Sequence, residues 1–346
     1  MFTTEFEGIN SFLVGMAKIL LENGVARTTR GEKCWELPAP VMIKIGNPLS
    51  RWITIPNRKW NFYLPYAESL WLALGRNDIE LIKYYLPKMA VFSDDREFLR
   101  GGYGPRLRYY NGNATDYKIA RNRNDVIFEN REIDQFYYIT ESFKRDPYTR
   151  QAIITIGDPP KDCFDIGNNI KQTKDLPCTQ LLQFMRNPVE NKLNLTVYMR
   201  SNDFIWGASA VNMFNYMFMQ EYFASMLGLH VGEYYHIANN LHYYDSRHRE
   251  LVENLASIEH ITDESFCYGK KFQSLKEFDR QLKKLGNWEQ NLRNGQINEL
   301  CDFDDDFFND WAKVLYLKIK NQSVEFSNPI LNKLSDISIL QDVPSN

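Results

Sequence analysis

The sequence predicts a mixed α/β (α+β) fold in which helices flank a sheet. Residues 192–199 alternate apolar and polar side chains, as a half-buried strand does. Residues 151–156 and 179–185 are two further strand-like stretches shortly before it. Residues 211–228 are nearly all apolar and predict a long helix in the core. Strands and a buried helix in close succession favour a sheet packed against helices.

The other elements follow from local patterns. In chain order, we expect an amphipathic helix at 12–21, a basic turn at 27–31, a strand at 41–45, helices at 66–74 and 78–90, and a glycine-rich turn at 101–106. From about residue 270 the sequence becomes charged and helix-favouring, and the last twenty residues lose clear periodicity. Residues 266–346 therefore predict a peripheral helical extension packed on the same domain.

Composition narrows the class of ligand. The 346 residues are 44% hydrophobic and 14% aromatic, which suits a large core. A net charge of −3 gives no general field for nucleic acid or an anionic membrane, so we expect neither partner and predict a small-molecule substrate. Five cysteines without CxxC spacing favour a reducing cytoplasm, and the histidine spacing gives no HExxH pattern and predicts no metal site.

The most informative feature is a cysteine at the start of one predicted strand and an arginine at the end of the next. Cys178 follows a proline and opens a strand-like stretch, and Arg200-Ser201 ends the next one. A thiolate beside cationic groups is a plausible nucleophile, and an arginine with a neighbouring hydroxyl can hold a phosphate. Cysteine is also a common inert core residue, and no local histidine supplies a base, so this pattern alone leaves both interpretations open.

Other positions carry weaker signals. Glu68 lies among apolar neighbours on a predicted helix, where it is either a paired core carboxylate or a general acid with a raised pKa. His242 and Tyr244 are two residues apart, so an extended chain points both to one side, which suits a sugar hydroxyl or an aromatic core edge. Asp302–Asp306 resemble a solvated helix start more than a calcium loop.

Taken in order, these motifs resemble the thymidylate synthase family, which includes pyrimidine-nucleotide hydroxymethylases. The likeness covers roughly residues 25–245 and rests on Pro177-Cys178, Arg200-Ser201-Asn202-Asp203, Asn212, His242-Tyr243-Tyr244, Glu68 with its Leu-Trp helix, Tyr103-Gly104, and Asp146–Arg150. The resemblance implies a catalytic domain over 1–265, a mixed sheet through which two subunits dimerise, and methylenetetrahydrofolate as cofactor. It also implies a pyrimidine nucleoside monophosphate as substrate.

The resemblance assigns a role to each position. Cys178 would add to C6 of the pyrimidine, Glu68 would move protons through ordered water, and Tyr103 would assist proton removal from C5. The phosphate would be bound by Arg30, Arg200 and Ser201 with Arg150 of the second subunit. The backbone at Asp203 and the amide of Asn212 would read the base, and His242 and Tyr244 would hold the ribose.

Departures from the family pattern separate the possible activities. Thr179 stands where synthases commonly have histidine, Gln151 replaces a second partner-subunit arginine, and Asn240 replaces an aspartate. Gly207 to Asn212 is one residue longer than the family's Gly-x-Pro-Phe-Asn. Asn212 favours uracil over cytosine, for which an aspartate is expected.

The segment expected beside the folate, 91–95, lacks tryptophan, and the tail does not match either. A looser seal favours attack by water, so we expect hydroxymethylation, of dUMP for example. Methylation of dUMP to dTMP is the alternative, and a non-catalytic nucleotide-binding homologue is a further one.

Overall fold

A computed structural model describes residues 1–29, 31–111, 117, 132–269 and 272–341. These residues form α-helices and β-strands, with short 3₁₀ segments and one π-helix among them. The α-helices are α1 (Ile9–Asn23), α2 (Tyr63–Ala73), α3 (Ile79–Tyr85), α4 (Tyr103–Arg108), α5 (Gln135–Arg145), α6 (Pro159–Asp162), α7 (Met213–Met226), α8 (Asp245–Ala256), α9 (Leu275–Arg293), α10 (Asp306–Lys320) and α11 (Pro329–Gln341). The 3₁₀ segments are η1 (Pro56–Arg58) and η2 (Pro87–Val91), and the π-helix is η3 (Phe204–Asn212).

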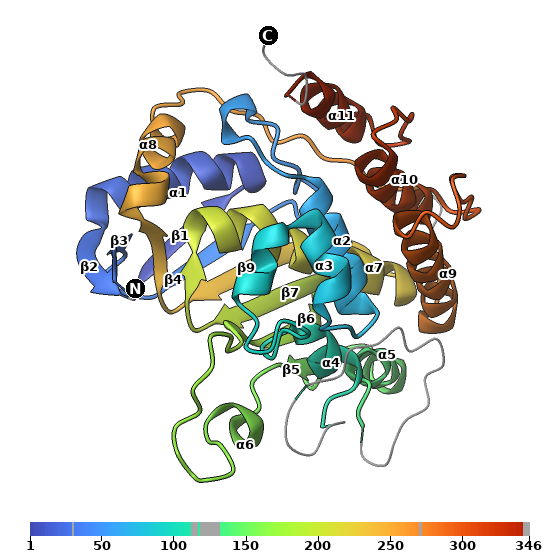
Figure 1. Cartoon of the computed structure of the whole chain (residues 1–346), viewed down its shortest axis with the longest axis horizontal. Coiled ribbons are helices and arrows are strands. Elements are labelled where there is room, and N and C mark those ends of the chain that lie inside the picture. The colour runs from blue at the N-terminus through green and yellow to red at the C-terminus, as the bar shows by residue number, and fades with distance from the viewer. Residues whose placement is uncertain (30, 112–116, 118–131, 270–271, 342–346) are drawn as a thin grey trace.

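Two sheets organise the strands, and both mix parallel and antiparallel pairs (Figure 1). The larger sheet has the order β1 (Phe2–Phe6), β4 (Val41–Ile45), β9 (His230–Ala238), β7 (Lys192–Met199), β6 (Thr179–Arg186) and β5 (Ile153–Thr155). The smaller sheet has the order β2 (Val25–Thr29), β3 (Glu32–Glu36), β10 (Leu241–Tyr244) and β8 (Asn202–Asp203). The mixed α/β fold class predicted from the sequence is confirmed.

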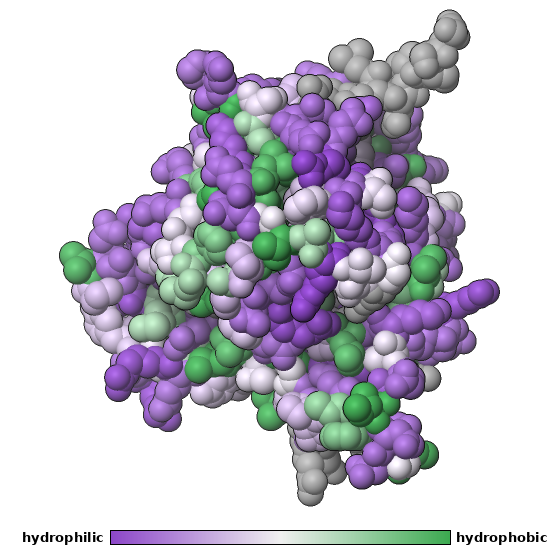
Figure 2. Space-filling view, turned by 90° about the vertical axis from the view of Figure 1, so that its left-hand side faces the viewer, coloured by the Kyte–Doolittle hydropathy of each residue, from purple (hydrophilic) through white to green (hydrophobic). Residues whose placement is uncertain are grey.

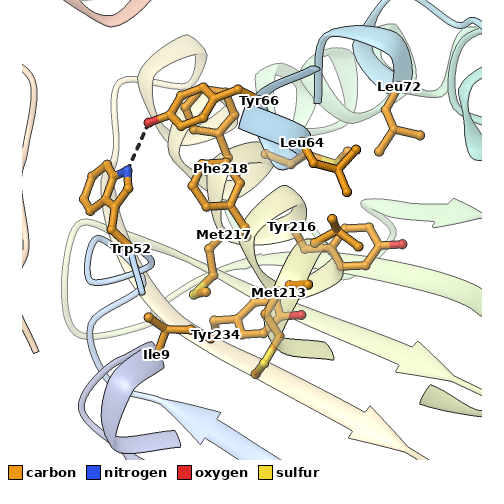
Figure 3. Close-up of a cluster of buried hydrophobic side chains, with 14 of the residues drawn as sticks. Ile9, Trp52, Leu64, Tyr66, Leu72, Met213, Tyr216, Met217, Phe218 and Tyr234 are labelled. Carbon is orange, nitrogen blue, oxygen red and sulfur yellow. Dashed lines mark hydrogen bonds between the residues drawn. The ribbon is translucent and has the colours of Figure 1, made fainter. Parts of the chain in front are cut away.

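One face of the larger sheet is buried under helices. Strands β4, β7 and β9 alternate buried and half-buried residues, and α7 packs on the buried side against β7 and β9. Figure 3 shows this layer, with Met213, Tyr216 and Met217 of α7 among the buried side chains. α7 is buried on nearly every side because α2 and α10 cover it, which explains its nearly continuous apolar sequence.

The opposite face of the larger sheet is only half-covered. The register aligns Lys44, Tyr235, Thr196, Gln183 and Ile153 in one row across five strands, and all of them are half-buried or exposed. The neighbouring row is similar and includes Leu181, which is 37% exposed. The described part of this chain therefore leaves one side of its main sheet open.

The C-terminal helices pack on the core. Phe218 of α7 stacks on Phe307 and meets Trp311 edge to face, and both partners belong to α10. The indole of Trp311 also donates a hydrogen bond to the Tyr66 carbonyl of α2, at 2.8 Å. α9 lies beside α10 along one edge of the molecule, and α11 follows it (Figure 1). The expected extension is helical, and α10 is an integral part of the core packing.

Four local predictions need correction. The helix predicted at 78–90 ends at Tyr85, because a proline at residue 87 disfavours helical backbone before it. The turn predicted at 101–106 becomes α4 from Tyr103 onward. The single helix predicted at 211–228 is divided between the end of η3 and α7. The last twenty residues, for which the lack of periodicity predicted no helix, contain α11, which has a proline at its first position.

One side of the molecule is mainly hydrophilic. Figure 2 shows a side of the molecule that is mainly hydrophilic, with hydrophobic residues in smaller groups. Within the ranges that the structure describes, no helix is both long and apolar enough to cross a membrane.

Candidate active site

The candidate nucleophile lies at the end of a loop that an arginine holds in place. Cys178 is half-buried directly before β6, and its carbonyl accepts a hydrogen bond of 2.9 Å from the Arg200 amide. The Arg200 guanidinium donates to the carbonyls of Leu176 and Pro177 at 3.1 and 3.0 Å. Arg200 follows β7, the antiparallel neighbour of β6, so strand pairing brings the two residues together. Arg200 remains exposed enough to meet an anionic ligand as well.

Three hydroxyl groups, those of half-buried Tyr103 and of buried Thr179 and Tyr216, form a layer next to this loop. The Tyr103 hydroxyl accepts a hydrogen bond from the Thr179 amide at 3.2 Å, and Thr179 Oγ1 lies 2.5 Å from the Tyr216 hydroxyl. Burial raises the pKa of Tyr103, and the neighbouring Cys178 acts in the same direction. The pKa of Tyr216 is also raised by burial. Both phenols therefore stay protonated at neutral pH and act as neutral hydrogen-bonding groups.

Glu68 has the electrostatics of a proton carrier. Burial raises its pKa from 4.5 to about 7, while the neighbouring Asn215 amide lowers it. The Asn215 carbonyl oxygen accepts a hydrogen bond of 2.9 Å from Ser69. The charge of Glu68 contributes to the raised pKa of Tyr216, which places the carboxyl close to the hydroxyl layer. A carboxyl that titrates near neutral pH can act as either general acid or general base.

Strands β8 and β10 carry the expected base and sugar contacts side by side. The two strands pair in parallel, with His242 opposite Asp203. His242 Nδ1 lies 2.8 Å from Asn240 Oδ1, which also accepts a hydrogen bond of 3.1 Å from the Ser201 hydroxyl. The rings of His242 and Tyr244 meet edge to face with centroids 5.3 Å apart. The structure thus brings Ser201, His242 and Tyr244 into one neighbourhood.

The π-helix accommodates the extra residue between Gly207 and Asn212. Asp203 caps the start of η3 by accepting hydrogen bonds from the Ile205 and Trp206 amides, at 2.8 and 2.6 Å. A π-turn joins residues five apart where an α-turn joins residues four apart, so a one-residue insertion is absorbed locally. Asn212 Nδ2 accordingly lies only 3.3 Å from the position that a side-chain carbon on Gly207 would take. The insertion leaves Asn212 beside the glycine.

The expected phosphate ligands are only partly assembled within one chain. Arg200 and Ser201 are adjacent near Cys178, whereas Arg150 is exposed just before β5, the edge strand of the larger sheet. Its carbonyl accepts a hydrogen bond of 3.0 Å from Gln183. Arg30 lies outside the described residues.

Sequence reasoning assigned no role to three residues that the structure places at this site: Asn202, Tyr216 and His236. Tyr216 looked like one more aromatic residue of an apolar helix, and nothing in the sequence separates it from its neighbours. His236 did leave a signal. It falls on the buried face of β9 together with Tyr234, so the alternation alone places an ionisable ring inside the protein.

This arrangement suits nucleophilic catalysis by a thiol, because a cysteine, a carboxyl with a raised pKa and several hydrogen-bonding side chains lie in one region. The family model described as "Thymidylate synthase" matches residues 16–290 of this chain. The chain belongs to the thymidylate synthase family.

Several curated relatives are phage proteins named "Deoxyuridylate hydroxymethyltransferase". The protein of Bacillus phage SP01 is 36% identical over 241 residues, which cover 69% of this chain and 58% of that protein. The protein of Pseudomonas phage M6 is 30% identical over 235 residues, covering 68% and 58%. The protein of Delftia phage PhiW-14 is 25% identical over 329 residues, covering 88% and 82%. The chain therefore spans less than two thirds of the length of the first two relatives.

Proposed function

We propose that this protein hydroxymethylates C5 of dUMP, with methylenetetrahydrofolate as the one-carbon donor. The observation that carries the proposal is the Cys178 loop, which Arg200 fastens beside Tyr103. The named activity of the phage relatives and the family membership support the same reaction. Methylation of dUMP is the alternative outcome, and the product separates the two.

The residues around the site fit a flat, bulky cofactor. Trp206 and Phe92 are 40% and 42% exposed, and such rings offer stacking surfaces for a pterin. Trp206 follows Asp203, whose pKa burial raises to about 6. The Phe92 segment lies along the Cys178 loop, because Asp94 accepts hydrogen bonds from Thr173 and Lys174. We assign the cofactor to Trp206, Phe92 and Asp203, and when bound it supplies a one-carbon unit at the oxidation level of formaldehyde.

The chain's own groups perform the remaining steps. The thiolate of Cys178 forms a bond to C6 of the uracil ring, which makes C5 a carbon nucleophile. Glu68 exchanges a proton through water with the ring carbonyl, and Tyr103 assists the departure of the C5 proton. A water molecule supplies the hydroxyl oxygen of the product, and elimination of Cys178 restores the ring. No reductant is required, because the carbon keeps its oxidation level.

Water access favours the hydroxymethyl product over the methyl product. Methylation needs a hydride and a site closed to water. The segment 91–95, which is expected beside the folate, has a valine and a phenylalanine and no tryptophan. Val91 is 68% exposed. The unmatched tail at 342–346 lies outside the described residues.

We propose that two copies form a homodimer through the open face of the larger sheet. Ile153, Leu181 and Met185 are 37, 37 and 39% exposed there, which is costly for a face that stays in water. Arg150 stands at the β5 edge of this sheet, where it is available to a second subunit. We also propose a cytoplasmic location, since no pair of the five cysteines forms a disulfide.

The decisive experiment incubates the protein with methylenetetrahydrofolate and dUMP, dCMP, UMP or CMP and measures product mass. We expect hydroxymethylated dUMP with release of tetrahydrofolate. Cys178→Ala should remove turnover while nucleotide binding persists, and Cys163→Ala, at an exposed cysteine, is the matched control. A methylated product with dihydrofolate would identify a thymidylate synthase. Nucleotide binding without folate consumption would identify a non-catalytic homologue.

A further inference from the structure

A chain of buried polar groups runs from the centre of the larger sheet to Asn212. It begins at His236 in β9, which is 0% exposed and lies between Ile43 of β4 and Val197 of β7. Both strand neighbours have apolar side chains, so neither side chain can form a hydrogen bond with the imidazole. A fully buried polar ring in an apolar row is costly unless its hydrogen bonds have a purpose or compensate fully.

Successive members of this series lie within hydrogen-bond distance of one another. Tyr234 Oη lies 2.8 Å from His236 Nδ1, and Asn202 Nδ2 lies 3.0 Å from His236 Nε2. Asn202 Oδ1 in turn accepts a hydrogen bond of 3.2 Å from Asn212 Nδ2. Burial lowers the pKa of His236 to about 4, so the ring is neutral at neutral pH and carries one proton. Because Nε2 accepts from Asn202, that proton is on Nδ1.

A sulfur atom fixes which way both amides point. Met199 Sδ lies 2.9 Å from Asn202 Nδ2 and 3.9 Å from Asn212 Nδ2. A thioether sulfur only accepts hydrogen bonds, so it favours an amide nitrogen and repels an amide oxygen. Reversal of Asn202 would place its oxygen against this sulfur. Asn202 therefore directs its side-chain oxygen toward Asn212, and Asn212 donates a hydrogen bond to it through Nδ2.

Gly207 leaves room for this contact. A side-chain carbon at Gly207 would lie 2.3 Å from Asn202 Oδ1 and 3.3 Å from Asn212 Nδ2. The first distance is far inside van der Waals contact, so any larger residue would displace the amide pair. The π-turn thus supplies both the position of Asn212 and the space for its partner.

We propose that Met199, Asn202 and His236 form a positioning unit that fixes the Asn212 amide to read uracil and to reject cytosine. The inference rests on the proposed function, because it takes Asn212 as the residue that faces the base. With one N–H used by Asn202, the half-buried Asn212 side chain keeps a second N–H and its Oδ1. These two groups match O4 and N3–H of uracil.

Cytosine presents the opposite pattern. Its N4 amino group donates and its N3 accepts, so it would need the Asn212 oxygen where uracil needs the nitrogen. Turning Asn212 over would set its oxygen against Asn202 Oδ1. Relief would require reversal of Asn202 and a proton shift on His236, and Met199 opposes the reversal. Discrimination between uracil and cytosine therefore depends on Met199, Asn202 and His236, which do not themselves contact the base.

The test compares dUMP and dCMP in wild type and in three variants. Kd is measured for each nucleotide without folate, and kcat/KM with it. Asn202→Ala removes the acceptor. We therefore expect the preference for dUMP over dCMP, taken as the ratio of the two kcat/KM values, to fall roughly tenfold or more. Asn202→Asp keeps an acceptor facing Asn212 but sets its second oxygen against Met199 Sδ and His236 Nε2, so the preference for dUMP should fall in this variant too. Ser209→Ala, at a buried residue of η3, is the control for helix packing and should leave the preference unchanged.

The outcomes separate this inference from the proposed function. Loss of the preference for dUMP in Asn202→Ala and Asn202→Asp, with the wild-type preference kept in Ser209→Ala, supports the positioning unit. An unchanged ratio in Asn202→Ala, or an equal loss of both substrates, overturns it, since structural damage lowers both alike. If wild type neither binds nor converts dUMP, the proposed function itself fails. Thermal melting of each variant confirms that the protein is folded.

Discussion

The pKa of Glu68 gives a prediction that joins stability to catalysis. A rise from 4.5 to about 7 corresponds to about 3 kcal/mol between the two protonation states. The folded-state pKa is raised, so the protonated carboxyl favours the fold, and this contribution is complete below pH 4.5. It is lost as the pH rises through about 7. Glu68→Gln stays neutral and should escape this loss.

We therefore expect Glu68→Gln to be more stable than wild type at alkaline pH. The difference in the free energy of unfolding should grow from under about 1 kcal/mol at pH 5 to at most about 3 kcal/mol at pH 8. Turnover should behave in the opposite way, because the amide carries no proton for catalysis. Wild-type turnover should show an inflection near pH 7, and the variant should lose most activity at every pH.

The assay is urea unfolding at pH 5 and pH 8 together with a pH profile of turnover. Glu22→Gln, at an exposed residue near the end of α1, is the control and should follow wild type in both measurements. An equal stability difference at the two pH values would refute the reasoning. So would an inflection near pH 7 that survives in Glu68→Gln, because another group would then be responsible.

Three further changes test the packing. Arg51→Met should cost about 3–5 kcal/mol in urea unfolding because it breaks the fully buried ion pair with Glu221; a double variant with Glu221→Leu should recover much of the loss. Gly207→Ala should reduce dUMP affinity measured by calorimetry, since the new carbon collides with Asn202, and unchanged affinity would argue against that contact. Trp311→Ala should cost about 3–5 kcal/mol and unfold in one transition with the rest of the chain; separate melting of the C-terminal helices would contradict a single domain.

Periodicity predicted the regular elements well. The strands at 41–45 and 192–199 were predicted with the bounds that the structure has, because apolar residues alternate there over a sheet with one buried face. The mixed fold and the family were also recognised from ordered motifs. Local patterns were sufficient for elements that have one face buried in the core, because burial alone sets their alternation of apolar and polar residues.

Prediction failed where several distant segments decide together. The π-turn of η3 depends on a single inserted residue and on the packing around it, and apolar sequence cannot distinguish it from an α-turn. The contact between Asn202 and His236 joins residues 34 positions apart, on strands of different sheets. Neither residue type is unusual by itself. Only the fold shows that the two form one hydrogen-bonded unit.

If Arg200 binds the substrate phosphate, as proposed, its hydrogen bonds to the Cys178 loop would couple substrate binding to the reactivity of the thiol. The guanidinium holds the carbonyls of Leu176 and Pro177 in the structure, and a bound phosphate would compete for the same donors. The environment of the thiol would then differ between the protein with and without bound nucleotide. The rate at which an alkylating reagent modifies Cys178 would consequently serve as a gauge of nucleotide occupancy, readable without any turnover.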